Sequence, residues 1–430
     1  MKKISVEHIA RVEGHGNIYV EIENGRARKV EMRVVEGSRM FEAFLRGRNY
    51  VETPEIASRV CAICSASHLI ASIKAIEDAV GVQPDEQTVL LRKLAIMGET
   101  IQSHVLHIYL LALPDYLGYP SVVHMVKEHG EAVKKALEMK KLGNDMAEVV
   151  GGRAVHLITP MVGGLTYVPK KSHLHSLKKR VLDLLPWAEK TVEIFGGLEN
   201  PPLERKTEYI ALYDPEEFCF YGGEKTVIRS SEGWTAPINR YREYITEAVV
   251  PYSTAKFGVR NGHGFMVGAL ARLNLNYDHL CDEAKEAVEK TPIRFPATNP
   301  FLNNFAQAVE TLHCFHESIR ILDDLECMDL REKRPEMDMK KHGWGHSAVE
   351  APRGTLYHSY LVNEKGIVEE ADIITPTAQN WKNLEEDIEA LVPLVSDRGY
   401  DEIQMAIEMN VRAYDPCISC STHVTQVKKR

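Results

Sequence analysis

Two pairs of cysteines near opposite ends of the chain constrain its fold more than any other feature. Cys61-Ala-Ile-Cys64 and Cys417-Ile-Ser-Cys420 both have two residues between their cysteines, and the pairs lie 356 positions apart (417 minus 61). Two intervening residues let both sulfurs turn toward one centre, which is the spacing of tetrahedral thiolate sites. Taken alone, this spacing leaves a structural zinc site and a redox disulfide open. If the pairs share one centre, the two ends of the chain must meet in the folded interior.

The surroundings of the two pairs favour a tuned metal centre over structural zinc. Structural zinc usually binds ligands that are close together in sequence, and it does not need a polar environment. Here Arg59 and His68 flank the first pair, and Asp415 and His423 flank the second. Soft thiolates suit nickel and iron as well as zinc, and ordered polar groups around thiolates tune a bound metal.

The composition indicates a globular protein that does not bind nucleic acid. The chain has 430 residues, 44% of them hydrophobic and 26% charged, with a formal net charge of -9 and no long basic block. Residues 1–10 lack an apolar core of signal-peptide length, and no apolar run reaches a membrane span. We therefore predict a cytoplasmic protein. Four isolated cysteines are expected to be ordinary buried residues: Cys219, Cys281, Cys314 and Cys327.

The hydrophobic periodicity predicts a mainly α fold with minor antiparallel β structure (α+β) and no clean linker. Residues 1–36 are expected to contain a β-hairpin that turns at Asn24–Gly25. Helical spacing runs from 54 to 113, where Pro84 opens a second helix and Pro114 stops it. Further helices are expected at 120–148, 171–197, 236–249, 275–290, 300–330 and 383–411, strands and loops at 199–235, and a second hairpin at 355–375.

Seven short blocks are spread over nearly the whole chain, 1–430. They are Arg11-Val-Glu13-Gly-His15; Arg59-Val-Cys61-Ala-Ile-Cys64-Ser-Ala-Ser-His68; Ser103-His104-Val-Leu-His107 with Pro114-Asp115; Gly151-Gly-Arg-Ala-Val-His156 with Gly163-Gly164; Phe265-Met-Val-Gly268 with Arg272; Glu350-Ala-Pro352-Arg353-Gly354; and Asp415-Pro-Cys417-Ile-Ser-Cys420-Ser-Thr-His423. In these blocks and in their order, the chain resembles the large subunit of nickel–iron hydrogenases. The form that it most resembles is the cytoplasmic, multi-subunit group that couples hydrogen to nicotinamide cofactors, including the sulfhydrogenases. One departure is Ala62, where the family usually has glycine.

The resemblance implies a catalytic subunit that cleaves H2 reversibly and heterolytically at a nickel–iron centre. All four cysteines of the two pairs would bind nickel, and Cys64 and Cys420 would also bridge to iron, whose carbon monoxide and cyanide ligands come from maturation. Cys417 would be the first base, and Glu13 the next proton carrier. His68 would donate a hydrogen bond to a bridging sulfur.

The resemblance also assigns roles to residues that do not bind the nickel. Arg353 would hold its guanidinium over the metals, oriented by Asp115 and Asp415, and Pro352 would shape the same wall. Glu42 and His423 would share a magnesium or iron ion that pins the chain's end. The alternatives are an ordinary glutamate for Glu13 and Glu42, a surface ion pair for the arginine and its aspartates, and a core histidine for His68.

Electrons released from hydrogen must leave through closely spaced carriers, and an iron–sulfur cluster normally needs four thiolates. Only four scattered cysteines remain after the metal ligands, so we expect no iron–sulfur cluster in this chain. The resemblance implies an iron–sulfur small subunit, and flavin- and NAD(P)-binding and further iron–sulfur subunits. It also implies that residues 424–430 are an extension removed by a maturation protease.

Three other functions remain to be separated from this one. A quinone-site subunit of respiratory complex I would share the fold but lack the cysteine pairs. A hydrogen-sensing regulatory subunit would bind the same metals with little turnover. A zinc-stapled, non-catalytic binding protein would hold zinc at the four thiolates.

Overall fold

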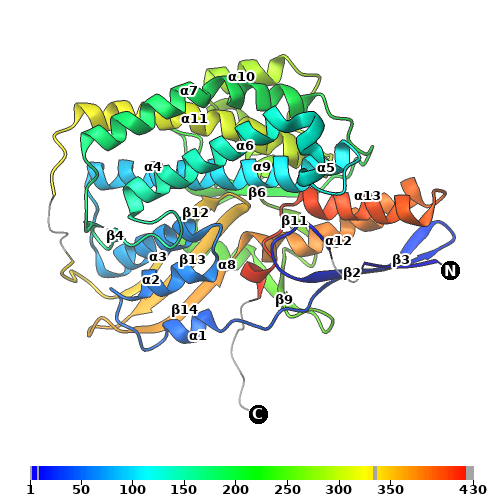
Figure 1. Ribbon diagram of the computed structural model, residues 1–430. Coiled ribbons are helices and arrows are strands. Elements are labelled where there is room, and N and C mark those ends of the chain that lie inside the picture. The colour runs from blue at the N-terminus through cyan, green and yellow to red at the C-terminus, as the bar shows by residue number, and fades with distance from the viewer. Residues whose placement is uncertain (1, 7–8, 333–336, 423–430) are drawn as a thin grey trace, which may run out of the picture.

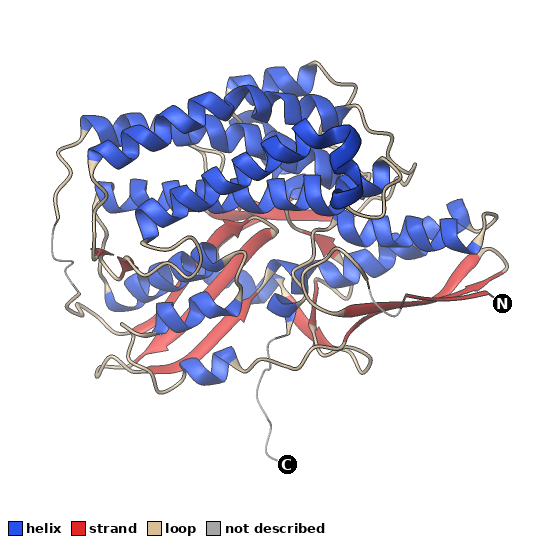
Figure 2. Ribbon diagram, viewed as in Figure 1, coloured by secondary structure: helices blue, strands red, loops and turns tan. Residues whose placement is uncertain are grey.

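The molecule is built from two layers, one of long helices and one of mixed helices and small sheets (Figures 1 and 2). The computed structural model describes residues 2–6, 9–332 and 337–422. The predicted α+β class, mainly helical, is confirmed. None of the described helices combines the length and apolar character needed to cross a bilayer. The long-helix layer contains α4 (Glu86–Val105), α6 (Val122–Gly151), α7 (Lys171–Gly196) and α11 (Asn303–Cys327), with α9 (Ala269–Asn276) and α10 (Asp282–Glu289) beside them.

Helices α4 and α6 touch backbone to backbone. A Cβ atom at Gly143 would lie 2.4 Å from the carbonyl oxygen of Gly98, so only glycine allows this approach. Helix α4 begins after Asp85, whose side chain accepts a hydrogen bond from the Thr88 amide at 2.9 Å. Because α11 packs against both α4 and α7, the layer presents one continuous face to the rest of the chain.

The second layer contains a three-stranded antiparallel sheet covered by α3 (Ser65–Val80). Helix α3 lies so close to the sheet that a Cβ atom at Gly345 would be 2.0 Å from the Ala75 carbonyl oxygen. The hairpin predicted at 355–375 is confirmed, and the Asn363 side chain accepts hydrogen bonds from the amides of its turn. The strands are β12 (Gly343–Ala351), β13 (Gly354–Val362) and β14 (Val368–Ile374).

The N-terminal hairpin is also confirmed, with an added strand. Asn24 (φ 51°) and Gly25 (φ 76°) both have positive φ, as the two central residues of a type I′ turn require. The strands are β1 (Lys2–Val6), β2 (Gly16–Glu23) and β3 (Arg26–Val34). Elsewhere, β4 (Pro160–Met161) pairs with β5 (Gly164–Leu165), β9 (Thr246–Val249) pairs with β10 (Lys256–Val259), and a sheet in the order β11-β6-β7-β8 is formed by β6 (Glu208–Tyr213), β7 (Val227–Ser230), β8 (Thr235–Pro237) and β11 (Phe265–Met266).

The helix predicted at 236–249 is wrong. This stretch forms β8, a 3-10 turn, the short helix α8 (Tyr241–Tyr244) and β9. The Tyr241 hydroxyl donates a hydrogen bond to the Ser359 hydroxyl oxygen at 3.0 Å, and its ring stacks on Tyr357. Pairing of β9 with β10 and this buried tyrosine override the helical spacing of the apolar residues.

Other helix boundaries shift, although α6, α7 and α11 confirm three of the predicted helices. The helix predicted at 383–411 is two helices, α12 (Pro376–Val395) and α13 (Tyr400–Ala413). The one predicted at 275–290 is α10, preceded by α9. Pro114 does not end its helix: a π-helical stretch at Leu106–Ala112 continues into α5 (Leu113–Tyr116), where proline occupies the first turn and needs no amide hydrogen.

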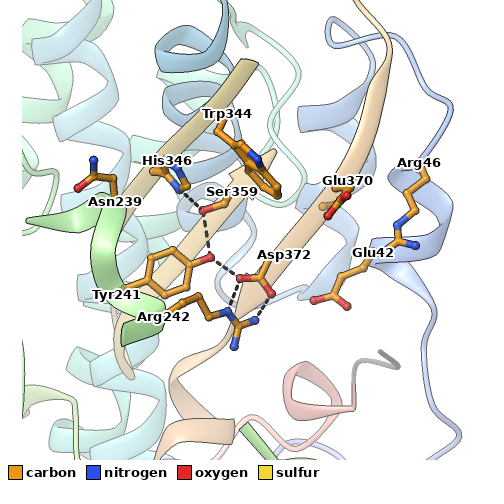
Figure 3. Close-up of a pocket in the computed structure, with 11 residues that line it drawn as sticks. Glu42, Arg46, Asn239, Tyr241, Arg242, Trp344, His346, Ser359, Glu370 and Asp372 are labelled. Carbon is orange, nitrogen blue, oxygen red and sulfur yellow. Dashed lines mark hydrogen bonds and ion pairs between the residues drawn. The ribbon is translucent and has the colours of Figure 1, made fainter. Parts of the chain in front are cut away.

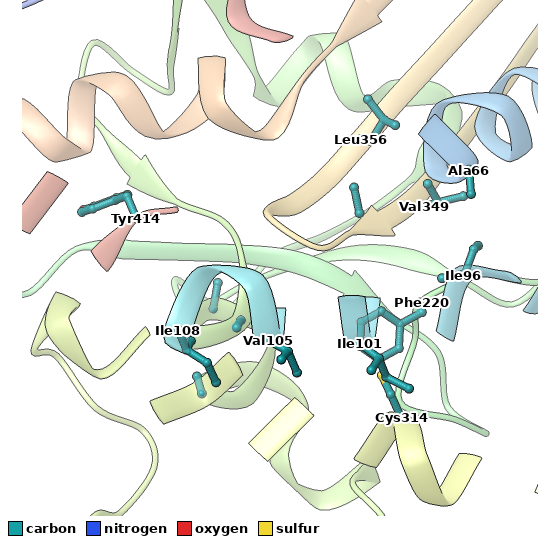
Figure 4. Packing of buried hydrophobic residues seen from close by; sticks show 14 of the residues in the cluster. Ala66, Ile96, Ile101, Val105, Ile108, Phe220, Cys314, Val349, Leu356 and Tyr414 are labelled. Carbon is teal, nitrogen blue, oxygen red and sulfur yellow. The ribbon is translucent and has the colours of Figure 1, made fainter. Parts of the chain in front are cut away.

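A large apolar cluster joins the two layers (Figure 4). It includes Ile101 of α4, Cys314 of α11 and Val349 of β12. Three of the isolated cysteines are buried as predicted, whereas Cys327, the last residue of α11, is exposed.

The two ends of the chain meet beside this core. An isolated bridge pairs Glu13 with Cys417, and α13 lies beside the N-terminal strands (Figure 1). The first cysteine pair follows α1 (Phe41–Leu45), α2 (Thr53–Ala57) and a 3-10 turn at Ser58–Val60, and the second follows α13 and includes a 3-10 turn at Ser419–Ser421.

Candidate metal centre

The four sulfurs of the two cysteine pairs converge on one buried point. All four Sγ atoms lie within 4.8 Å of one another, and each residue is at most 5% exposed. Cys61 Sγ is 3.5 Å from Cys417 Sγ, and Cys64 Sγ is 3.9 Å from Cys420 Sγ. Each sulfur of one pair therefore faces a sulfur of the other.

Local backbone structure aims these sulfurs. Cys61 is extended, and its sulfur accepts a hydrogen bond from the Cys64 amide at 3.1 Å; Cys64 then caps α3. On the other side, the Cys417 amide donates to Thr377 Oγ1 at 3.0 Å. The Cys420 amide bonds back to the Cys417 carbonyl at 3.1 Å, which closes a tight turn around the site.

Two of the four thiols are arranged to ionise readily. Burial alone would raise their pKa values, but hydrogen bonds with the neighbouring sulfurs lower the pKa of Cys61 well below its ordinary value and also lower the pKa of Cys417. A hydrogen bond with Cys417 raises the pKa of Cys64, and burial raises the pKa of Cys420, in both cases well above the ordinary value. Thiolate sulfurs such as those of Cys61 and Cys417 are suited to binding soft metal ions.

Glu13 lies directly against one sulfur. Its Oε2 accepts a hydrogen bond from Cys417 Sγ at 3.1 Å, and Ser419 donates to the same carboxylate from its amide, at 3.1 Å, and from its hydroxyl. Burial, followed by the Cys417 charge, raises the pKa of Glu13 to about 7. Gly14 (φ 88°) lets the loop that carries Glu13 lie close to Ile418, because a Cβ atom at Gly14 would be 2.8 Å from the Ile418 Cβ atom.

Arg353 lies in the turn between β12 and β13, and Asp415 holds its side chain. Its Nε donates to the Asp415 carbonyl at 2.6 Å, and its Nη2 donates to Asp415 Oδ1 at 2.8 Å. Although burial opposes it, Asp415 and then the cysteine sulfurs raise the pKa of Arg353 well above its usual range. Its Nη1 is buried and has no hydrogen-bond partner among the described residues.

The prediction that Asp115 orients Arg353 is corrected by the structure. Asp115 Oδ2 accepts from Arg412 Nε at 2.6 Å, and Asp115 Oδ1 binds Arg11. Both carboxylate oxygens are therefore used by arginines of α13 and of the N-terminal loop. Asp115 holds these segments together and does not contact Arg353.

Pro352 and His68 are the other two residues predicted to act at the centre. The Pro352 carbonyl accepts a hydrogen bond from Arg272 Nη2 at 3.0 Å, and Arg272 is itself paired with Glu310 and Glu350 in the core. His68 Nδ1 is 3.0 Å from His358 Nε2, and within the described part of the chain its buried Nε2 has no hydrogen-bond partner.

Arg39 joins both cysteine segments, and sequence reasoning missed it. Its Nη2 donates to the carbonyl of Val60, next to Cys61, at 2.9 Å, and also to the carbonyl of Ser419. Its amide donates to the Thr422 carbonyl at 2.7 Å. The sequence gives no signal for Arg39, because its hydrogen bonds go to backbone carbonyls, and every residue type has one.

Arg39→Met is therefore expected to loosen the centre. Losing two charge-assisted hydrogen bonds should lower the free energy of unfolding by about 2–3 kcal/mol and reduce the nickel and iron bound per protein. Calorimetry and elemental analysis measure both quantities. Arg48→Met is the control, since Arg48 is exposed and bonds only weakly to Phe44, at 3.4 Å. Unchanged metal content in the Arg39 variant would contradict this role.

Glu42 does not fit the predicted chain-end metal site well. It is buried, and its Oε1 accepts a hydrogen bond from the Ile373 amide at 3.0 Å and lies 3.6 Å from Lys256 Nζ. Burial raises the pKa of Glu42, and Lys256 opposes that shift. The predicted partner His423 and the predicted extension 424–430 lie outside the described residues.

The donor set at the cysteine cluster fits nickel and iron. Thiolates are soft ligands that suit both ions. The buried, unpartnered Nη1 of Arg353 and Nε2 of His68 are polar atoms of the kind that a bound group would satisfy. Zinc also accepts four thiolates, but a zinc staple gives no reason for a carboxylate and a charged guanidinium to be buried around them.

Comparisons with known proteins agree with this geometry. The family described as nickel-dependent hydrogenase matches residues 39–135 and 213–423, more than half of the chain. Sulfhydrogenase 1 subunit alpha of Pyrococcus furiosus is 39% identical over 425 residues, which cover 99% of this chain and 98% of the relative. Sulfhydrogenase 2 subunit alpha of the same organism is 34% identical over 430 residues, covering 99% and 100%.

Solved structures share the fold across almost all of the chain. A NAD+-reducing NiFe hydrogenase in its H2-reduced state superposes with a TM-score of 0.85 at 26% identity, covering 98% of this chain and 100% of that one. A Ni-Fe-Se hydrogenase from D. vulgaris Hildenborough superposes with a TM-score of 0.81 at 21% identity, with the same coverage.

Proposed function

We propose a division of catalytic roles for this chain, which belongs to the nickel-dependent hydrogenase family as the catalytic large subunit of a nickel–iron hydrogenase. The reaction is the reversible heterolytic cleavage of H2 to protons and electrons. One observation carries the proposal: four buried sulfurs from segments 356 residues apart lie within 4.8 Å of one another.

The four cysteines hold the metals. Cys61, Cys64, Cys417 and Cys420 would hold nickel and iron, and maturation would supply carbon monoxide and cyanide ligands to the iron. When bound, this centre polarises H2 so that it splits heterolytically. Burial keeps bulk water away from the four sulfurs, because each cysteine is at most 5% exposed.

The proton leaves through Cys417 and Glu13. The Cys417 thiolate accepts the proton at Sγ, and Glu13 Oε2, 3.1 Å away, takes it next. A carboxyl with a pKa of about 7 can accept and release a proton near neutral pH with little energetic cost. Ser419 holds the carboxylate facing the sulfur.

Arg353 stabilises the charge that separates during cleavage. Asp415 holds two of its nitrogens, which leaves Nη1 to face charge that develops beside the sulfurs. Pro352 keeps the turn in place, and His68 donates from Nε2 to a bridging sulfur. Asp115 contributes indirectly, by holding Arg412 and Arg11.

Arg353→Lys is expected to lower turnover by about 10²–10³-fold, while nickel and iron stay bound. Lysine keeps one positive charge but cannot bond to Asp415 through two nitrogens and still present a third. Hydrogen-dependent dye reduction and metal analysis on the same sample measure the effect. Arg240→Lys, at an exposed arginine paired with Glu243, should change neither. Loss of metal together with activity would assign Arg353 a structural role instead.

The electrons pass to partner subunits. The relatives are named as alpha subunits, and one solved relative is a NAD+-reducing enzyme. We infer an iron–sulfur small subunit, with flavin- and NAD(P)-binding and further iron–sulfur subunits, in a cytoplasmic complex. Three of the remaining cysteines are buried and one is exposed, and none joins a metal-binding group among the described residues. Purification of the native complex identifies these subunits directly.

Two predictions concern the chain's end. A maturation protease removes 424–430 after nickel insertion; an intact Arg430 in nickel-loaded protein, seen by mass spectrometry, would contradict this. The magnesium or iron ion expected at Glu42 and His423 stays a prediction, since His423 lies outside the described residues and Lys256 Nζ lies 3.6 Å from the Glu42 carboxylate.

Hydrogen-dependent reduction of a viologen dye by the purified complex tests the proposed function. We expect H2 to reduce the dye and reduced dye to release H2, because cleavage at this centre is reversible. A complex that carries nickel and iron but turns over neither way would favour a hydrogen-sensing subunit.

A further inference from the structure

Lys256 is a buried cation shared by two buried carboxylates. Its Nζ lies 3.0 Å from Glu247 Oε2 and 3.6 Å from Glu42 Oε1. The three side chains are 4–7% exposed. They come from α1, β9 and β10, and the Ile373 amide of β14 donates to the same Glu42 oxygen. One ammonium group therefore links elements that are far apart in the sequence.

Glu42 lines a pocket of about 780 Å³, together with Arg242 and Asp372 (Figure 3). Arg242 donates to Glu247 Oε2 at 3.2 Å and is paired with Asp372, as the dashed lines in Figure 3 show for the second pair. Two cations, Lys256 and Arg242, thus serve three carboxylates. One formal negative charge is left over among these five groups.

This cluster supports the segment that holds the metal centre. Thr254, two residues before Lys256, donates from its hydroxyl to the Glu36 carbonyl at 2.7 Å. Glu36 and Glu42 are thus both anchored to the strand that carries Lys256. Between them, Arg39 bonds to the carbonyls of Ser419 and Thr422 at the second cysteine pair.

We propose that the Lys256 ammonium is the cation that Glu42 requires, so that this chain pins its C-terminal cysteine segment without a divalent metal ion. A divalent ion at Glu42 would stand beside an ammonium group already within 4 Å of the same carboxylate, and the two cations would repel each other. Magnesium also needs near-octahedral oxygen ligands, whereas the Glu42 oxygen faces an amide and an ammonium. The inference rests on the proposed function in one respect: that function explains why the cysteine segment has to be held in place.

Thermal unfolding of the purified complex in EDTA and in excess magnesium chloride tests this proposal. The wild-type complex should unfold at the same temperature in both buffers. In Lys256→Ala, Glu42 and Glu247 lose their cation, so the rate of unfolding at a fixed temperature should rise roughly tenfold or more. Magnesium should restore much of this loss, because two carboxylates and water can then bind it. Lys256→Arg should remain independent of magnesium.

Lys225→Ala is the matched control, since Lys225 forms an exposed pair with Glu216 and its loss should change nothing. The proposal is overturned if EDTA destabilises the wild-type complex and magnesium alone restores it, or if Lys256→Ala unfolds like wild type. If Lys256→Ala does not fold, the wild-type and Lys256→Arg comparisons still decide. Because unfolding is read without H2, a failure here is distinct from a failure of the dye assay.

Discussion

Cys417→Ser is expected to lower the rate of hydrogen-dependent dye reduction by roughly 10³-fold or more. The substitution removes a soft ligand from a four-sulfur site and replaces the first proton acceptor by a hydroxyl that does not ionise near neutral pH. It also removes the sulfur that contacts Glu13 at 3.1 Å. Nickel content should fall with activity, and elemental analysis of the purified complex measures it.

The control for this substitution is Cys327→Ser. Cys327 is exposed at the end of α11 and belongs to no metal-binding group of the described residues. Its replacement should leave nickel, iron and turnover at wild-type levels. A Cys417 variant that keeps both nickel and turnover would show that this sulfur is neither ligand nor base.

Glu13→Gln is expected to lower turnover by about 10²–10³-fold without loss of metal. Glutamine keeps the shape of the side chain and can still accept hydrogen bonds from Ser419, but it cannot carry a proton away from Cys417. Isotope exchange between H2 and heavy water should slow together with dye reduction, since both need the proton to leave. Infrared bands of the carbon monoxide and cyanide ligands proposed for the iron should keep their intensity.

Glu36→Gln provides the comparison for Glu13. Glu36 follows β3, where its Oε1 accepts a hydrogen bond from the His15 amide at 3.0 Å, and among the described residues its side chain forms no hydrogen bond with the cysteines. Turnover should therefore stay at the wild-type rate. Equal rates for the Glu13 variant and wild type would assign proton transfer to another group.

Features with strong local signals could be predicted from the sequence. The two Cys-x-x-Cys pairs indicated convergence, and Asn24–Gly25 indicated a hairpin, because spacing and turn chemistry are local properties. The resemblance indicated Glu13, Arg353 and Asp415, which the structure brings to the cysteine cluster.

Features that depend on long-range contacts could not be predicted in this way. Arg39 acts through the carbonyl of Ser419, 380 positions away, and Lys256 acts through Glu42. The resemblance implies that Asp115 orients Arg353, whereas in the fold Asp115 binds Arg11 and Arg412. The helix expected at 236–249 failed for the same reason, since its residues are fixed by a neighbouring strand and a buried tyrosine.

Anomalous diffraction from crystals of the active complex, collected at the iron, nickel and zinc absorption edges, tests the meeting of the two chain ends most directly. We expect one nickel peak and one iron peak beside the sulfurs of Cys61, Cys64, Cys417 and Cys420, which lie together in the structure. A single zinc peak among these sulfurs, or metal peaks elsewhere, would contradict the account.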